Sequence, residues 1–119
     1  MDRFRPDALL PLTPVAFEIL LALADGERHG YSILQEVEQR SGGAVSLHAG
    51  TLYRALARLL ESGLIEELAD SPDPSSTDER RRYYALTARG VAVARAEAER
   101  LEGQVAAARA RRLLKGARA

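Results

Sequence analysis

His48–Leu60 reads HAGTLYRALARLL, and this stretch decides how the rest of the chain is interpreted. Its leucines recur at helical spacing and predict one apolar stripe: Leu52, Leu56, Leu59 and Leu60. The opposite face carries Thr51, Arg54, Arg58 and Glu61, with Gly50, Tyr53 and Ala57 beside it. Arginine forks match guanine edges or phosphates, and hydroxyl groups reach phosphate oxygens. The pattern therefore predicts a helix that enters a DNA major groove.

The composition indicates one globular domain with a modest core. The chain has 119 residues, of which 46% are hydrophobic and 29% charged. It contains no cysteine, which excludes disulfides and thiol-based metal or catalytic sites. No apolar run is long enough to span a bilayer, and the N-terminus lacks the apolar segment of a signal peptide. We therefore expect a soluble, cytoplasmic protein with no membrane partner.

Charge is balanced over the whole chain but is distributed locally. Seventeen basic residues match seventeen acidic ones, which argues against a nonspecific polycation that coats nucleic acid. Residues 80–82 are three consecutive arginines, and residues 88–119 carry a clear excess of basic side chains. We expect DNA binding at defined sites, with a strong dependence on salt.

The segments before His48 predict the two helices that precede a recognition helix. Residues 1–12 are expected to form an arm without regular helix, which either touches DNA or a partner subunit or is a loosely ordered end. Thr13 and Pro14 mark the start of a first helix. A second helix is expected over Gly30–Arg40. Together with His48–Leu60, these segments match the helix-turn-helix plan.

The segments after His48–Leu60 predict a wing and a long last helix. Leu64–Leu68 and Arg82–Leu86 are expected to be strands on either side of a polar loop. A last helix is expected from Ala88 to about Leu114. Its apolar positions alternate by three and four residues, as in a coiled coil: Val91, Ala94, Ala98, Leu101, Val105 and Ala108. A helix of about 40 Å is longer than a small winged helix can cover, so we expect these six residues to pair with a second copy and not with their own domain.

Three segments resemble the PadR-type winged-helix transcriptional regulators: LTPVAFEILLALADGERHGYSILQEV, GTLYRALARLLESGLIEE and DERRRYYALTARG. The resemblance runs from about Leu12 to Gly90 and rests on HGY, GTLY, GLI and RRRYY-x-LT in this order. It implies a mainly α fold with a small β wing. The implied organisation is an N-terminal arm (1–12), a winged helix-turn-helix domain (13–87), and a C-terminal dimerisation helix with a basic tail (88–119).

The family pattern also implies which residues meet DNA. It assigns contacts to Thr51, Tyr53 and Arg54 on the third helix, to the start of the second helix around Tyr31, and to the wing arginines. The candidate DNA-binding residues are therefore Tyr31, Thr51, Tyr53, Arg54, Arg58, Arg80, Arg81 and Arg82. Strand alternation sends neighbouring arginines to opposite faces, so we expect only one or two of the three wing arginines to touch DNA.

Each candidate also has a purely structural interpretation. Arg54 and Arg58 fit a solvated face with local ion pairs, and Tyr53 fits the edge of the core. His48 and Ala49 stand where family members often have Ser-Pro, so the entry of the third helix departs from the pattern. The chain has a single C-terminal helix, and in this it resembles the short subgroup of the family, which lacks the extra helical domain of longer members. The chain has no tryptophan, so the planar-drug pocket of one short member is not expected.

The sequence predicts neither an enzyme nor a metal protein. The only two histidines, His29 and His48, lack cysteine partners and ligand spacing. Nothing orients a Ser-His-Asp set, and we expect no cofactor. An apolar gap between the last helix and the first helix is the expected place for a small-molecule effector, which the sequence does not identify.

The leading hypothesis is a homodimeric, sequence-specific transcriptional regulator that acts as a repressor. A two-fold dimer would read a palindromic operator with half-sites about one helical turn apart. The alternative is a winged helix that acts through a partner protein, because the net charge is zero and the second helix is acidic.

Overall fold

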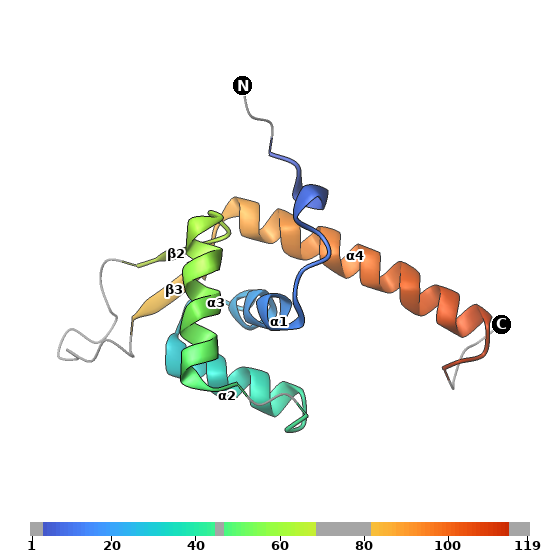
Figure 1. The fold of residues 1–119 in the computed structure, drawn as a ribbon, viewed down its shortest axis with the longest axis horizontal. Coiled ribbons are helices and arrows are strands. Elements are labelled where there is room, and N and C mark those ends of the chain that lie inside the picture. The colour runs from blue at the N-terminus through green and yellow to red at the C-terminus, as the bar shows by residue number, and fades with distance from the viewer. Residues whose placement is uncertain (1–3, 45–46, 69–81, 115–119) are drawn as a thin grey trace.

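The helix α1 (Pro14–Leu23) lies at the centre of the fold, and the other elements pack around it (Figure 1). The computed structural model describes residues 4–44, 47–68 and 82–114. The remaining elements are η1 (Pro6–Leu9), β1 (Arg28–His29), α2 (Gly30–Arg40), α3 (Ala49–Glu61), β2 (Ile65–Glu67), β3 (Tyr83–Leu86) and α4 (Ala88–Ala110). α2, α3, β3 and α4 all contact α1. The mainly helical fold with a small sheet confirms the predicted winged helix.

The start of α1 follows from its sequence. The Thr13 hydroxyl accepts a hydrogen bond from the Ala16 backbone N–H at 3.1 Å, and Pro14 occupies the first turn, where no N–H partner is needed. Ile19, Leu20 and Leu23 then point into the core, which they share with residues of α2, α3, the sheet and α4. The buried core members outside α1 are Ile33, Val37, Leu52, Leu56, Leu59, Leu64, Ile65, Tyr84 and Val93.

The sheet is antiparallel and has the order β1-β3-β2. In the hairpin, Ile65 pairs with Leu86 and Glu67 with Tyr84, so β2 and β3 form the expected wing. The two strands are shorter than predicted by one or two residues at their ends. β1 was not predicted, because two residues carry no alternation from which a strand can be recognised.

The N-terminal arm is not loose over its described residues. η1 packs against α4, and the Arg89 guanidinium carbon lies 4.7 Å from the centre of the Phe4 ring. The backbone N–H of Leu12 donates a hydrogen bond of 2.9 Å to the Glu97 carboxylate on α4. The expectation of a loosely ordered end is therefore wrong for residues 4–12, because apolar and polar contacts fix them to the chain's own last helix.

The helix α4 ends at Ala110, four residues before the expected position. Arg112 has a φ of +62°, and the N–H groups of Leu113 and Arg112 turn back to the carbonyls of Ala108 and Arg109. This arrangement is a Schellman motif, which usually uses glycine where Arg112 stands. The absence of glycine explains why the sequence did not reveal this helix end. The C-terminal half of α4 extends away from the other elements (Figure 1).

In the described ranges, no helix has both the length and the apolar character needed to cross a membrane.

Candidate nucleic-acid interface

The helix α3 is anchored by its leucines and exposes its polar face, as predicted. Leu52, Leu56 and Leu59 are buried, whereas the Arg54 and Arg58 side chains are exposed. His48 occupies the N-cap position without a side-chain hydrogen bond to the first turn. The helix therefore begins without a side-chain cap at the point where the sequence departs from the family pattern, and it still adopts the predicted span to within one residue.

The two arginines of α3 stand one helical turn apart. In residues 4–44, 47–68 and 82–114, neither guanidinium takes part in an ion pair or a hydrogen bond. The alternative of a solvated face with local ion pairs therefore lacks those pairs. Thr51, one turn before Arg54, is half-buried on the same side of the helix. These side chains present cationic and hydroxyl groups that suit phosphates and base edges.

Tyr53 lies on another side of α3, against the start of α2. A Cβ placed on Gly30 would lie only 2.8 Å from the Tyr53 hydroxyl oxygen, so glycine permits this contact. The tyrosine is half-buried and packs against the core, as the structural interpretation of this residue proposed. The contact brings the N-terminus of α2 beside α3, and thus places the first turn of α2 next to the candidate recognition helix.

The first turn of α2 carries Tyr31, which is 57% exposed. Its ring stacks on the ring of His29, with centroids 6.5 Å apart. His29 Nδ1 accepts a hydrogen bond from the Ser32 backbone N–H at 3.0 Å and so caps α2. The rings of His29 and Tyr83 of β3 are also perpendicular to each other, in a T-shaped contact with centroids 5.4 Å apart. The α2 start and the wing therefore form one continuous polar and aromatic surface.

The described part of the wing contributes one exposed arginine, Arg82, to the candidate interface. Arg82 Nη1 lies 3.1 Å from a Glu67 carboxylate oxygen on β2, so the two strands are also joined by an ion pair. Tyr84, beside it, is buried, and this burial is the main cause that raises the pKa of its hydroxyl. Tyr83, the preceding residue of β3, is only half-buried, as the alternation of side chains along a strand predicts. Arg80 and Arg81 lie outside the described residues.

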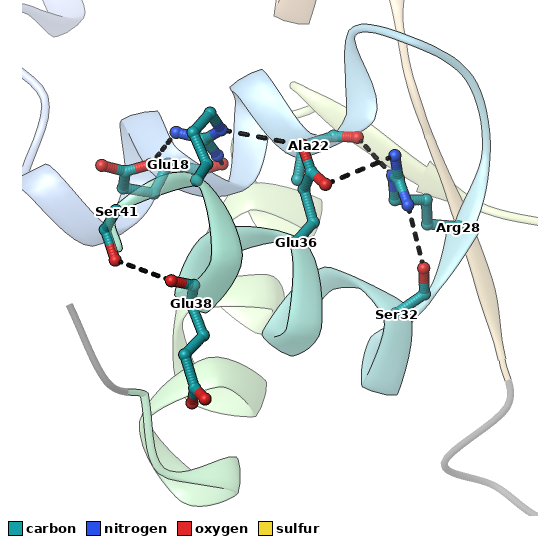
Figure 2. A network of polar contacts seen from close by, with 8 residues as sticks. Glu18, Ala22, Arg28, Ser32, Glu36, Glu38 and Ser41 are labelled. Atoms are coloured by element: carbon teal, nitrogen blue, oxygen red, sulfur yellow. Dashed lines mark hydrogen bonds and ion pairs between the residues drawn. The ribbon is translucent and has the colours of Figure 1, made fainter. Parts of the chain in front are cut away.

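Acidic side chains of α1 and α2 are neutralised by arginines on the surface where these two helices meet (Figure 2). Arg40 forms ion pairs with Glu18 and Glu36, and Arg28 lies 3.8 Å from Glu36. The Arg28 side chain also donates hydrogen bonds to the Ala22 carbonyl and the Ser32 hydroxyl. Within α2, whose acidic charge had suggested a protein partner, this network pairs Glu36, whereas the Glu38 carboxylate forms no ion pair among the described residues.

The six predicted dimerisation residues are not all free of the chain's own domain: Ala94 packs against the core, so the expectation that all six face a second copy is wrong for this residue. The fully buried residues of α4 are Gly90, Val93 and Glu97, and Ala94 lies beside them. The predicted positions are exposed or half-buried: Val91, Ala98 and Val105 are exposed, and Ala94, Leu101 and Ala108 are half-buried. The sequence missed Glu97 as a buried residue, because a carboxylate among alanines is usual on a solvated helix face.

A hollow of about 440 Å³ lies between η1, α1 and α3. Its position differs from the gap between α4 and α1 that the sequence suggested for an effector. Among the described residues, no group of three or more His, Asp or Glu side chains is arranged to hold a metal ion.

Comparisons with known proteins agree with this geometry. The sequence model described as "Transcriptional regulator PadR-like family" matches residues 19–96. An uncharacterised 37.1 kDa protein in transposon TN4556 of Streptomyces fradiae is 40% identical over 90 residues, which cover 73% of this chain. The match spans 24% of that protein, so the chain corresponds to about a quarter of that relative.

Solved structures show the same fold. A transcriptional regulator from Clostridium thermocellum matches with a TM-score of 0.64 and 28% identity, over 78% of this chain and 84% of that one. Bacillus subtilis PadR, solved in complex with operator DNA, matches with a TM-score of 0.59 and 24% identity, over 75% of this chain and 47% of that one. The chain belongs to the PadR-like family of transcriptional regulators, and its fold is the winged helix of that family.

Proposed function

We propose that the protein is a homodimeric repressor that binds a palindromic operator. The observation that carries this proposal is the pair of exposed arginines Arg54 and Arg58. Neither has an ion-pair partner among the residues that the structure describes, and both lie on a helix anchored by buried leucines. The related Bacillus subtilis PadR was solved on operator DNA. A fixed cationic helix face is also what a major groove requires.

The proposed DNA contacts are assigned to bases or to phosphates according to the chemistry and position of each side chain. Arg54 projects from the outward face of α3 and is assigned to base edges, and Arg58 and Thr51 to base edges or phosphates. The exposed Tyr31 at the start of α2 and the Tyr53 hydroxyl beside Gly30 are assigned to the phosphate backbone. Arg82, with Arg80 and Arg81, is assigned to the wing contact with the adjacent groove. The arm (1–12) supports α4, residues 13–87 bind DNA, and residues 88–119 pair the two copies.

The exposed apolar positions of α4 provide the dimer contact in this proposal. Val91 is 37% and Val105 38% exposed, and both lie on the same side of a helix that extends beyond its own domain. Apolar side chains that recur every three or four residues are buried when two such helices pair. A two-fold pair of helices would place two copies of α3 on one face of the duplex.

The alternative is a winged helix that binds a protein partner through its acidic second helix. The ion pairs of Glu18 and Glu36 with Arg40 and Arg28 reduce the free acidic charge at the α1–α2 surface, where the Glu38 carboxylate is left for such a partner among the described residues. Selection of random duplexes by the purified protein at moderate salt distinguishes the two functions. An enriched palindrome that is lost in the Arg54→Ala/Arg58→Ala variant supports the repressor, with Arg95→Ala on α4 as a matched control. Failure to enrich any palindrome would favour the protein partner.

A further inference from the structure

The hollow between η1, α1 and α3 has an apolar floor. Its walls are formed mainly by Leu9, Pro11, Leu12, Val15, Ala16 and Leu59. A volume of about 440 Å³ lies in the range of small-molecule sites. Leu9, at its edge, is 40% exposed, although a leucine gains free energy when it is covered. The hollow therefore offers uncovered aliphatic surface on the side of the recognition helix.

Two cationic side chains also line this hollow. Arg54 and Arg58 of α3 both line the hollow, and neither has an ion-pair partner in the part of the chain that the structure describes. Within the same ranges, no acidic side chain lines it, and its other polar side chains are those of Thr13, Thr51 and Ser62. The residues that line the hollow thus combine aliphatic side chains with two arginines and three hydroxyl groups.

This combination selects one class of ligand. A guanidinium binds a carboxylate through two parallel hydrogen bonds, and an apolar floor favours an apolar chain attached to it. Among the described residues no aromatic side chain lines the hollow to stack on a flat ring. We propose that the hollow binds an aliphatic carboxylate, with its chain against Leu9, Val15 and Ala16 and its carboxylate at Arg58 and Arg54.

Occupancy of this site would act directly on DNA binding, a consequence that rests on the proposed function. The carboxylate would take the same two guanidinium groups that face DNA, so ligand and operator compete for Arg54 and Arg58. The coupling is reciprocal: the carboxylate lowers the affinity for DNA, and DNA lowers the affinity for the carboxylate by the same factor. No movement of α4 or of the dimer is required.

The first test uses the protein without DNA, so that its result is independent of the proposed function. Sodium octanoate is titrated calorimetrically, and octylammonium chloride and sodium acetate serve as controls for charge and for the chain. We expect one octanoate site per protomer and at least about tenfold weaker binding of both controls. Equal binding of octanoate and octylammonium, or no octanoate binding, would overturn the proposal.

A matched pair of variants tests whether the carboxylate binds in this hollow. Leu9→Glu and Leu9→Lys remove the same apolar side chain from an exposed position, but they bring opposite charges to the rim. We expect octanoate affinity to fall about tenfold or more in Leu9→Glu relative to Leu9→Lys, since the added carboxylate repels the ligand. Circular dichroism checks that both variants are folded. Equal octanoate affinities in the two folded variants would place the ligand elsewhere and overturn the assignment.

The second test adds an operator obtained by duplex selection. Octanoate is expected to raise the apparent Kd for DNA in proportion to its occupancy, without a change in sedimentation coefficient. If octanoate binds but leaves DNA affinity unchanged, the competitive mechanism is wrong while DNA binding stands. If binding of octanoate disappears as the protein associates at high concentration, a second copy of the chain covers the hollow and the ligand proposal is wrong.

Discussion

The carboxylate of Glu97, on α4, accepts a hydrogen bond of 2.9 Å from the backbone N–H of Leu12, 85 residues earlier in the chain. The same side chain forms an ion pair with Arg100, and Glu97 is only 2% exposed. This contact joins the entry of α1 to the middle of α4. This buried carboxylate therefore helps to fix the long helix on the DNA-binding domain, together with the packing of α4 on η1, α1 and β3.

Replacement of Glu97 by alanine should destabilise the fold by about 1.5–3 kcal/mol, the range for hydrogen bonds to a charged group. The Leu12 N–H then loses its acceptor, and the packing of the arm on α4 is weakened. Glu97→Gln retains an oxygen of similar position and should cost less. Urea unfolding at a fixed protein concentration measures the free energy of unfolding of both variants. Glu99→Ala, at an exposed position of the same helix, should change stability by no more than about 0.5 kcal/mol.

The same carboxylate should make stability depend on pH in the acid range. The hydrogen bond from Arg100 is the main cause that lowers the pKa of Glu97 below its ordinary value of 4.5. The unfolded chain therefore takes up this proton first as the pH falls. The stabilisation is present above pH 4.5 and is lost as the pH drops through the lower folded pKa. The stability difference between the wild type and Glu97→Gln should shrink below pH 4.5; a constant difference would contradict the ion pair.

Gly30→Ala should disturb the junction between α2 and α3. The added Cβ would lie 2.8 Å from the Tyr53 hydroxyl oxygen and 3.3 Å from a ring carbon, so the tyrosine must move. We expect a loss of about 1–3 kcal/mol, as for an overpacked site. Because the clash involves one side chain, the cost should be largely removed in a Tyr53→Leu background. A double-mutant cycle from urea unfolding checks this coupling, and additive effects would show that the contact is not the cause.

Arg54→Ala should weaken operator binding by about 1–3 kcal/mol if Arg54 reads a base. The loss should be concentrated at one or two operator positions, because a base contact discriminates sequence whereas a phosphate contact does not. Fluorescence anisotropy with single-substituted duplexes measures the profile. Unchanged affinity in a folded Arg54→Ala protein would remove this residue from the interface.

Ala98→Asp should weaken self-association while leaving each protomer folded. Ala98 is exposed on α4 and lies in the middle of the apolar positions proposed for dimerisation, so the new carboxylate would be desolvated only when two helices pair. We expect the dimer Kd to rise at least about tenfold. Ala107→Asp, on the opposite side of the same helix, is the matched control. Sedimentation velocity over a range of concentrations distinguishes the two variants.

The sequence was informative wherever local chemistry alone determines the structure. Thr13 and Pro14 set the start of α1, and the leucine spacing of α3 predicted its buried face. The Schellman end of α4 was not predicted, since Arg112 adopts a backbone conformation that usually indicates glycine. Contacts across long sequence separations, such as Leu12 with Glu97, leave no local pattern.

In the candidate site, too, features set by local sequence could be predicted, whereas features set by long-range packing could not. The exposure of Arg54 and Arg58 follows from helical periodicity and was predicted. The direction of Tyr53 depends on how closely α2 approaches, and Gly30 alone did not distinguish a backbone contact from a side-chain contact. The hollow beside α3 depends on where the arm packs, which proline positions alone do not determine.

The histidine cap of α2 fixes a tautomer at the edge of the candidate interface. His29 Nδ1 accepts the Ser32 N–H, so this nitrogen carries no proton and the ring proton must sit on Nε2. A neutral imidazole that is bound in this way offers its remaining nitrogen only as a donor. Any group that binds at Nε2 must therefore accept a hydrogen bond. Phosphate and carbonyl oxygens can do so, whereas ammonium groups cannot.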